Sequence, residues 1–248
     1  MSYVIYFDES YDNTKLYFLQ GALFCPHSRA IHKAVKEVKD NYNYVDPNGK
    51  SLEAKYNDCV SKWDFRVCRD LIDRFIDSTA WFRCVVIDID LIDYEKFGKP
   101  SESDKIKKAR MYKKFAELLI RNNIGNVRNA VLLTDMMTRT PGDQFIEKMM
   151  EVFGIPNPVD GRPVIKHTAE TDFSLEQYHT GQVCDILLGC TLGGLVPPKM
   201  KTKLALINYM KNSLRIPSFE RDYWIKLTRH QKKILHPKYQ IWFWTPGK

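Results

Sequence analysis

The order of its apolar segments constrains the fold of this chain more than any other feature. The strand-like runs YVIYF (residues 3–7) and KLYFLQGALF (residues 15–24) flank the turn-rich DESYDNT, which predicts a β-hairpin. Three more strand-like runs follow at residues 80–91, 129–135 and 164–170, separated by segments with helical spacing. This order predicts an α/β fold in which helices cover both faces of a mixed sheet.

Five segments show the apolar spacing of helices, and the last of them is unusual. Ser61 and Asp64 form a predicted capping box in front of the second helical segment. The last segment, residues 174–195, begins polar and becomes apolar on nearly all sides, which is typical of a buried helix. Asp185 lies in the middle of this apolar run and therefore needs an explanation.

Composition favours one large domain, or a domain with an appendage. The chain has 248 residues, of which 44% are hydrophobic and 27% charged, so it can bury a sizeable core. No run approaches the roughly 18 to 20 apolar residues of a membrane span, and the N-terminus does not resemble a signal peptide. The six cysteines have no zinc-site spacing. We therefore expect a soluble, cytoplasmic protein that has reduced core thiols and does not associate with membranes.

The positive charge is concentrated in the last fifth of the chain. Residues 199–248 carry twelve Lys or Arg and two Asp or Glu, a net charge of +10, whereas residues 1–198 carry −2. We expect residues 1–198 to form the core domain and residues 199–248 a basic, aromatic extension packed on it. The extension can contact phosphates and stack on bases, or it can be a solvated helix face over an aromatic core. The first alternative assigns nucleic-acid binding to Lys226, Arg229, Lys232 and Lys233.

Three acidic residues occupy positions where a carboxylate is costly. Asp8 follows the apolar run of the first predicted strand, Asp135 ends a later one, and Asp185 lies inside the apolar helix. A buried carboxylate needs a partner, and in open α/β sheets functional groups gather at the carboxyl ends of strands. On a helical wheel Gln182, Asp185 and Gly189 lie within about 60° of one another. Each acid taken singly is also compatible with a salt bridge, but together they predict a shared site.

The chemistry of this set favours hard cations. Carboxylates that converge without a supply of His or Cys suit Mg²⁺ or Mn²⁺. Two such ions about 3.5 to 4 Å apart can bind the attacking and leaving oxygens of a phosphodiester. Phosphodiester hydrolysis is therefore the reaction that the pattern predicts.

Short motifs in the same order resemble a known family. They are Asp8-Glu9-Ser10 after the first strand, Glu53-Ala54-Lys55 followed by Tyr56, Asp135, and Gln182-Val183-Cys184-Asp185 in the last core helix. Over residues 3–195 the chain thereby resembles the family catalogued as domain of unknown function 3800, which is thought to have an RNase H-like fold. The resemblance implies a metal site built from Asp8, Glu53, Asp135 and Asp185. Tyr11 replaces the glycine that usually ends the first motif, and Cys184 stands where a small residue is common.

The resulting hypothesis is a Mg²⁺- or Mn²⁺-dependent nuclease, or another phosphodiester-processing enzyme, that uses two ions. The four acids are the predicted ligands and a metal-bound water the nucleophile, with Lys55 as an accessory catalytic group and Glu9, His179 and Gln182 as further accessory residues. DNA or RNA is the expected partner, and partner proteins of a defence or mobile-element system are a further possibility. Two alternatives stay open: a non-catalytic binding protein with the same fold, and strand transfer at the same site.

Two other acidic patterns have competing interpretations. Asp46 with Glu53-x-Lys55 is similar to a restriction-type nuclease site, but there the Glu-x-Lys motif lies on an apolar central strand, and this segment is polar. Asp88 and Asp90 are predicted on one side of a strand, where they form either a paired-carboxylate site or a rim facing solvent. His179 has the alternative role of a surface helix histidine.

Overall fold

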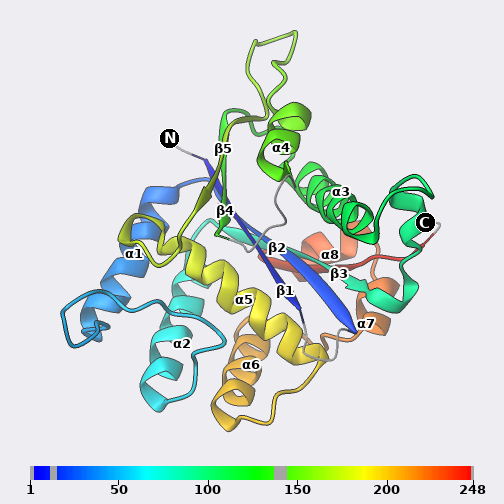
Figure 1. The fold of residues 1–248 in the computed structure, drawn as a ribbon. Helices are drawn as coiled ribbons and strands as arrows, with labels where there is room; N and C mark the ends of the chain where they lie inside the picture. The colour runs from blue at the N-terminus through cyan, green and yellow to red at the C-terminus, as the bar shows by residue number, and fades with distance from the viewer. Residues whose placement is uncertain (1–2, 12–15, 137–143, 247–248) are drawn as a thin grey trace.

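A six-stranded mixed sheet forms the centre of the computed structural model, which describes residues 3–11, 16–136 and 144–246 (Figure 1). The strand order is β5-β4-β1-β2-β3-β6. The strands are β1 (Val4–Tyr11), β2 (Tyr17–Cys25), β3 (Trp81–Asp88), β4 (Ala130–Asp135), β5 (Ile165–Thr171) and β6 (Tyr239–Phe243). Strands β1, β2 and β3 pair antiparallel, whereas β4 is parallel to β1, β5 to β4 and β6 to β3. The predicted hairpin and the mixed sheet are thus confirmed.

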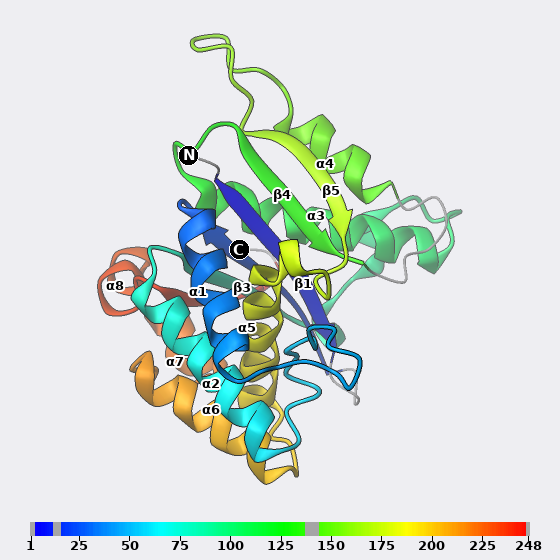
Figure 2. The same ribbon diagram turned by 90° about the vertical axis from the view of Figure 1, so that its left-hand side faces the viewer.

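Helices cover both faces of this sheet. On one side lie α1 (Ser28–Asn41), α2 (Lys62–Asp77), α5 (Thr180–Leu195) and α6 (Lys201–Ser213), as Figure 2 shows. On the other side lie α3 (Asp104–Ile124) and α4 (Phe145–Phe153), and the short α7 (Arg221–Lys226) and α8 (Arg229–Leu235) adjoin β6. The capping box of α2 is present as predicted.

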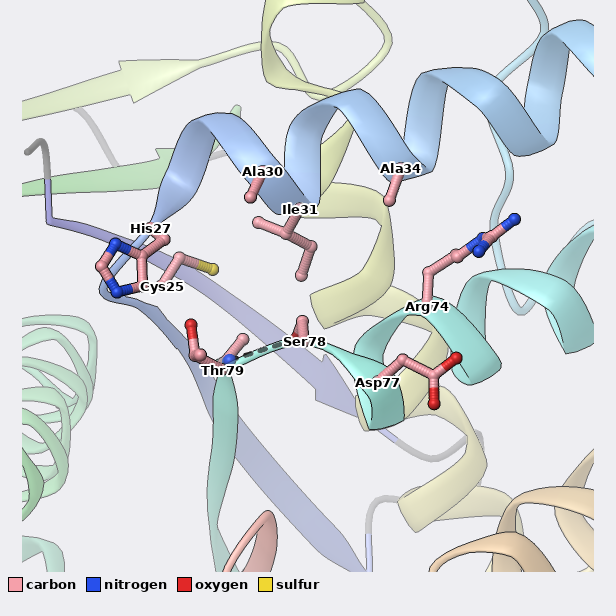
Figure 3. Close-up of a pocket in the computed structure, with 10 residues that line it drawn as sticks. Cys25, His27, Ala30, Ile31, Ala34, Arg74, Asp77, Ser78 and Thr79 are labelled. Carbon is pink, nitrogen blue, oxygen red and sulfur yellow. Dashed lines mark hydrogen bonds between the residues drawn. The ribbon is translucent and has the colours of Figure 1, made fainter.

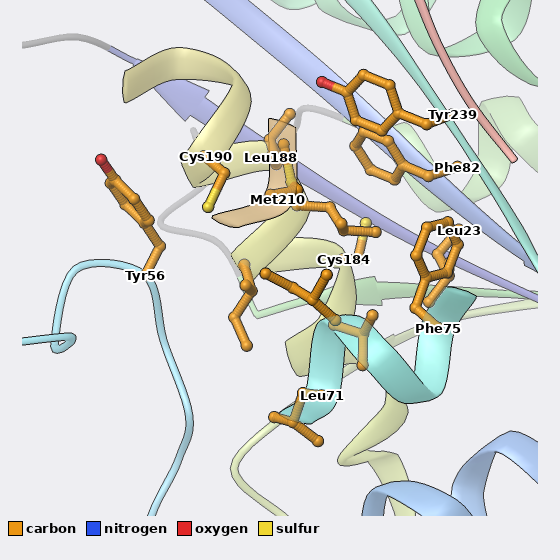
Figure 4. Packing of buried hydrophobic residues seen from close by; sticks show 14 of the residues in the cluster. Leu23, Tyr56, Leu71, Phe75, Phe82, Cys184, Leu188, Cys190, Met210 and Tyr239 are labelled. Atoms are coloured by element: carbon orange, nitrogen blue, oxygen red, sulfur yellow. The ribbon is translucent and has the colours of Figure 1, made fainter. Parts of the chain in front are cut away.

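The side-chain alternation of the strands divides the core into two clusters. Tyr6 and Phe82 pack on the α5 side, whereas Ile5 and Phe7 pack on the α3 side. Helix α5 is buried along nearly its whole length, as its apolar sequence predicts, and Figure 4 shows its packing. All six cysteines are buried and free. Among the described residues, no helix combines the length and apolar content that crossing a membrane requires.

The end of strand β1 differs from the prediction. Strand β1 does not stop before the acids but continues to Tyr11, so Asp8 pairs with Gly21 of β2 inside the sheet. Strand β1 is longer than predicted because its pairing with β2 continues as far as Tyr11 and Phe18. The rings of these two residues stack with centroids 4.6 Å apart. Tyr11 therefore stands in a strand, not in a turn.

The expected pair of acids on β3 does not form. Strand β3 ends at Asp88, and Asp90 lies in the following 3₁₀ turn. Asp88 Oδ1 accepts the Asp90 backbone N–H at 3.1 Å, so Asp88 caps this turn. The prediction of two carboxylates on one side of a strand is wrong, because the strand ends between them.

The basic C-terminal segment contributes directly to the sheet and the core. Its strand β6 extends the sheet beside β3, although the sequence pattern predicts no strand there. Trp224 is fully buried, lies against Tyr239 and donates its indole N–H to the Ser218 carbonyl at 2.9 Å. These aromatic side chains are core residues and do not offer exposed faces for stacking on bases.

Candidate active site

Two of the predicted acids, Asp8 and Asp135, lie at neighbouring positions on two adjacent parallel strands. Phe7 of β1 is in register with Thr134 of β4, and Asp8 and Asp135 come next on the two strands. Alternation places Asp8 on the side of Tyr6, which faces α5, and Asp8 is only 7% exposed. Leu133 packs in the same cluster, so Asp135 is on this side as well. The sheet therefore brings Asp8 and Asp135 together as predicted.

Helix α5 supplies the third acid and holds the segment that carries Glu53. Gln182 Oε1 accepts the Ala54 N–H at 3.0 Å, and Asp185 Oδ2 accepts the Tyr56 N–H at 2.7 Å. A Cβ on Gly189 would lie 2.3 Å from Cγ of Tyr56, so only glycine lets this ring approach the helix. The polar face with its adjoining glycine is present as predicted. It binds the backbone of residues 54–56, and Figure 4 shows Tyr56 beside α5.

Glu53 and Lys55 alternate with the two tethered residues. Their side chains form an ion pair, with Lys55 Nζ 2.9 Å from Glu53 Oε2, and both are partly buried. The segment has no regular secondary structure at these two residues, so Glu53 lies neither on a helix nor on a strand. Asp46 binds the backbone N–H groups of Asn48 and Lys50 in a turn. This arrangement speaks against the restriction-type alternative, which needs Glu-x-Lys on a strand.

The acids interact electrostatically. Burial, followed by the charges of Asp185 and Asp135, raises the pKa of Asp8 well above its ordinary value. Burial raises the pKa of Asp185 to about 6, and Glu53 and Asp135 contribute to that rise while the Tyr56 N–H and Lys55 oppose it. Burial also raises the pKa values of Asp135 and Glu53. Ionising any of these carboxylates therefore costs free energy in the folded protein.

Lys55 is the cation that serves this cluster. Burial lowers its pKa, but the ion pair with Glu53 and the charges of Asp135 and Asp185 outweigh that effect and raise it. The charge of Lys55 opposes those of Glu53, Asp135 and Asp185, so among the described residues the cluster carries excess negative charge when its four carboxylates are ionised.

Hydrogen bonds to backbone N–H groups orient the three aspartates. Asp8 Oδ1 accepts the Glu9 N–H at 2.7 Å, and Asp135 Oδ1 accepts those of Met136 and Phe173 at 3.0 and 3.2 Å. Asp185 uses Oδ2, which accepts the Tyr56 N–H. Between residues that the structure describes, no hydrogen bond engages the second oxygen of these three side chains. One oxygen of each carboxylate is anchored, and the other can take a ligand.

The donor set fits a hard cation by its chemistry, although the side chains do not form a closed metal centre. Carboxylate oxygens with raised pKa values, with one lysine and no imidazole or thiolate among them, are suited to Mg²⁺ or Mn²⁺. Within residues 3–11, 16–136 and 144–246, no group of three or more His, Cys, Asp and Glu side chains has a geometry that could hold a metal ion. Asp8, Glu53, Asp135 and Asp185 are neighbours, not a preformed cage.

The predicted accessory residues have different positions. Glu9 follows Asp8 in β1, so alternation directs its side chain away from α5. Gln182 is buried and tethers Ala54 through its Oε1. His179 is also buried and contacts Lys39, so the interpretation as a surface histidine is wrong.

Two residues near the cluster were not predicted from the sequence. Asp172 directly follows β5, and its charge contributes to raising the pKa values of Glu53 and Asp135. Its signal was available, because β5 ends at the same edge as β4 and is also followed by an acid. Lys39 is buried on α1, and the charge of Glu53 favours its protonated form. No pattern in the sequence distinguishes it from the exposed lysines of that helix.

The basic residues predicted to bind nucleic acid lie apart from the carboxylates. Lys226 ends α7, and Arg229, Lys232 and Lys233 lie on α8, where all but the partly buried Lys232 are exposed. Arg229 donates to the Asn122 carbonyl at the end of α3, so α8 adjoins the opposite side of the sheet from α5. Strands β2 and β3 separate β6 from β1, a distance of about 14 Å at ordinary strand spacing.

A separate pocket of about 340 Å³ lies between the start of α1 and the end of α2 (Figure 3). Its lining is mainly apolar, with Arg74 and Asp77 among the few charged groups. None of the predicted site residues lines it. We therefore place the candidate active site at the carboxylates between β1, β4 and α5.

Comparison with known proteins adds no assignment. No family model matches the chain, and no curated protein matches it significantly. The resemblance to the family of domain of unknown function 3800 therefore stays a prediction.

Proposed function

We propose that the protein is a Mg²⁺- or Mn²⁺-dependent phosphodiesterase that acts on nucleic acid. The observation that carries this proposal is the convergence of Asp8, Asp135 and Asp185 from two neighbouring strands and α5, where burial and the charges of neighbouring carboxylates raise the pKa values of Asp8 and Asp185. A chain gains nothing in stability from gathering buried like charges, so their presence is best explained by a cation that binds there. The RNase H-like resemblance implies acids from the first strand, a helix region, a middle strand end and a late helix. The three aspartates have the origins implied for them, whereas Glu53 does not lie on a helix.

Each residue has a defined role in this proposal. Asp8, Glu53, Asp135 and Asp185 are the ligands, each aspartate with one oxygen already oriented by a backbone N–H. When bound, the divalent ions polarise the phosphodiester and lower the pKa of water. Lys55, which pairs with Glu53, balances negative charge at the cluster and in this proposal stabilises the charge that develops on the phosphate. Gln182 positions Glu53 and Lys55 through the Ala54 backbone.

Cleavage assays with and without metal test this function. Wild type, Asp8→Asn and Asp185→Asn are incubated with single- and double-stranded DNA, RNA and RNA–DNA hybrids in Mn²⁺ or in EDTA. Asp160→Asn is the matched control, because Asp160 is exposed and uses Oδ1 to accept a backbone N–H in a similar way.

We expect Mn²⁺-dependent cleavage by the wild type and the control, and a loss of about 100-fold or more in both site variants. Cleavage that survives in the site variants would place the chemistry elsewhere. No cleavage of any substrate by folded wild type would favour the non-catalytic binding protein.

A further inference from the structure

A second polar pocket adjoins the candidate active site. It has a volume of about 400 Å³ and lies between α1, the 43–51 segment and the start of α5. Charged and polar side chains line most of it, including those of Lys36, Lys39, Asn43, Ser51, Glu176 and His179. Nothing in the proposed chemistry uses this pocket.

Lys39 is the unusual residue of the pocket. Its side chain is 3% exposed, and no ion pair joins it to a carboxylate in the part of the chain that the structure describes. Its Nζ instead lies 3.1 Å from Gln182 Oε1, 3.2 and 3.3 Å from Nε2 and Nδ1 of His179, and 5.9 Å from the centre of the Tyr44 ring. A buried ammonium group with only neutral partners is costly, and a bound anion would offset that cost.

His179 does not supply the missing negative charge. Its Nε2 lies 3.1 Å from the Ser174 carbonyl oxygen, which can only accept, so Nε2 carries the proton and Nδ1 is the ring nitrogen that offers a lone pair to Lys39. Burial and then the charge of Lys39 lower the pKa of His179 to about 4, so the ring is neutral at pH 7. Burial lowers the pKa of Lys39 to about 8, which still leaves it mostly protonated at pH 7.

The other charges at the pocket do not neutralise Lys39 directly. Glu176 forms an ion pair with Lys36, and Asp40 is exposed. Their charges, with that of Glu53, favour the protonated form of Lys39 without contacting it. The pocket therefore presents one buried positive charge to whatever enters it.

Gln182 connects this pocket with the carboxylates. Its Oε1 accepts from both Lys39 and the Ala54 N–H, and Ala54 is next to Glu53 in the chain. Gln182 also precedes Asp185 by one turn of α5, a rise of about 5 Å. A group bound by Lys39 would thus lie next to the segment that carries Glu53.

We propose that this pocket binds a phosphate group of the nucleic-acid strand adjacent to the phosphodiester processed at the carboxylates. The substrate class in this inference rests on the proposed function. A phosphate group is small enough for the pocket and offers several oxygens to the Lys39 ammonium. The phosphate is either the terminal phosphomonoester of a strand or an internal phosphodiester.

Two asparagines with the same backbone conformation provide the variant and its control. Asn43 lines the pocket, is exposed and has φ 46°. Asn129 is also exposed, has φ 58° and lies in the loop before β4, outside the pocket. Asn43→Asp adds a negative charge to the pocket without disturbing the buried network, whereas Asn129→Asp adds the same charge elsewhere. Lys39→Gln with Lys33→Gln, an exposed position on the same helix, forms a second pair.

Binding is measured in EDTA, by ³¹P NMR titration with inorganic phosphate and by fluorescence anisotropy with short labelled oligothymidylates. We expect Asn43→Asp to weaken binding about threefold and Lys39→Gln about tenfold or more, with both controls at the wild-type value. Equal binding by wild type, Asn43→Asp and Lys39→Gln would overturn the proposal. An absence of phosphate binding by folded wild type would overturn it as well.

Oligothymidylates with a 5′-phosphate, a 3′-phosphate or neither distinguish the two sources of the phosphate. If the pocket binds a terminal phosphate, one of the phosphorylated oligothymidylates should bind wild type more tightly than the others, and Lys39→Gln should abolish that difference. If it binds an internal phosphate, Lys39→Gln should weaken the binding of all three oligothymidylates equally. The readout needs neither metal nor turnover. Lys39-dependent binding without cleavage would refute only the proposed function, and cleavage with unaltered binding in Lys39→Gln would refute only this pocket.

Discussion

Asp185→Asn should stabilise the metal-free protein at alkaline pH, which is the opposite of what most buried substitutions do. Burial raises the pKa of Asp185 from 3.8 to about 6, a difference of about 2 units. At about 1.4 kcal/mol per unit, the ionised side chain lowers the free energy of unfolding by about 3 kcal/mol at pH 8. The amide removes the charge, and its oxygen can still accept the Tyr56 N–H.

The sign of the pH dependence follows from the raised pKa. The folded protein binds the proton more tightly than the unfolded chain, so wild type gains stability as pH falls from 8 through about 6 towards 4. Asp185→Asn lacks this gain. We therefore expect the variant to exceed wild type by about 1 to 3 kcal/mol at pH 8, with the difference shrinking as pH falls to 4.

Urea denaturation in EDTA, followed by tryptophan fluorescence at several pH values from 4 to 8, measures this difference. Asp160→Asn, at an exposed loop position, should leave it near zero throughout. The reasoning would be refuted by an Asp185→Asn variant that is less stable than wild type at pH 8. A difference that does not change with pH would refute it too.

Three further predictions concern the surroundings of the cluster. Gly189→Ala should lower the urea midpoint and the cleavage rate, because the added methyl group would overpack against Tyr56. Overpacking costs about 1 to 3 kcal/mol, which outweighs a gain in helix propensity of at most about 1 kcal/mol. A raised midpoint would contradict this. Lys55→Gln should raise the pKa of Glu53 by removing its ion pair, shifting the acidic limb of the pH–rate profile upward, and an unshifted limb would count against the contact. Trp224→Ala should cost about 3 to 5 kcal/mol in one cooperative urea transition, whereas a loss below about 1 kcal/mol would show that the C-terminal segment unfolds separately.

The sequence predicts the parts of this fold that depend on local patterns. Apolar alternation and helical spacing were sufficient for the hairpin and for the buried helix around Asp185, and the spacing of Ser61 and Asp64 was sufficient for the capping box. The predicted end of β1 was wrong, because the strand continues past Asp8 through pairing with β2, which does not depend on local composition. Strand β6 was missed, since a short strand at the edge of a sheet has little periodicity of its own.

The candidate site also contains residues that local sequence reveals and residues that only tertiary contacts reveal. A costly carboxylate can be recognised from its apolar neighbours, which is why the sequence alone was sufficient to select Asp8, Asp135 and Asp185. The burial of Lys39 could not be recognised in this way, because it arises from the approach of α5 to α1 and from contacts with His179 that are distant in the chain.

Mn²⁺ binding is the most direct test of the central claim that the carboxylates form a metal site. Electron paramagnetic resonance of free Mn²⁺ during titration counts bound ions without requiring any substrate. The account predicts saturable binding to wild type and to Asp160→Asn, and its loss in Asp8→Asn and Asp185→Asn. Wild type that binds no Mn²⁺, or site variants that bind it as tightly as wild type, would contradict the account.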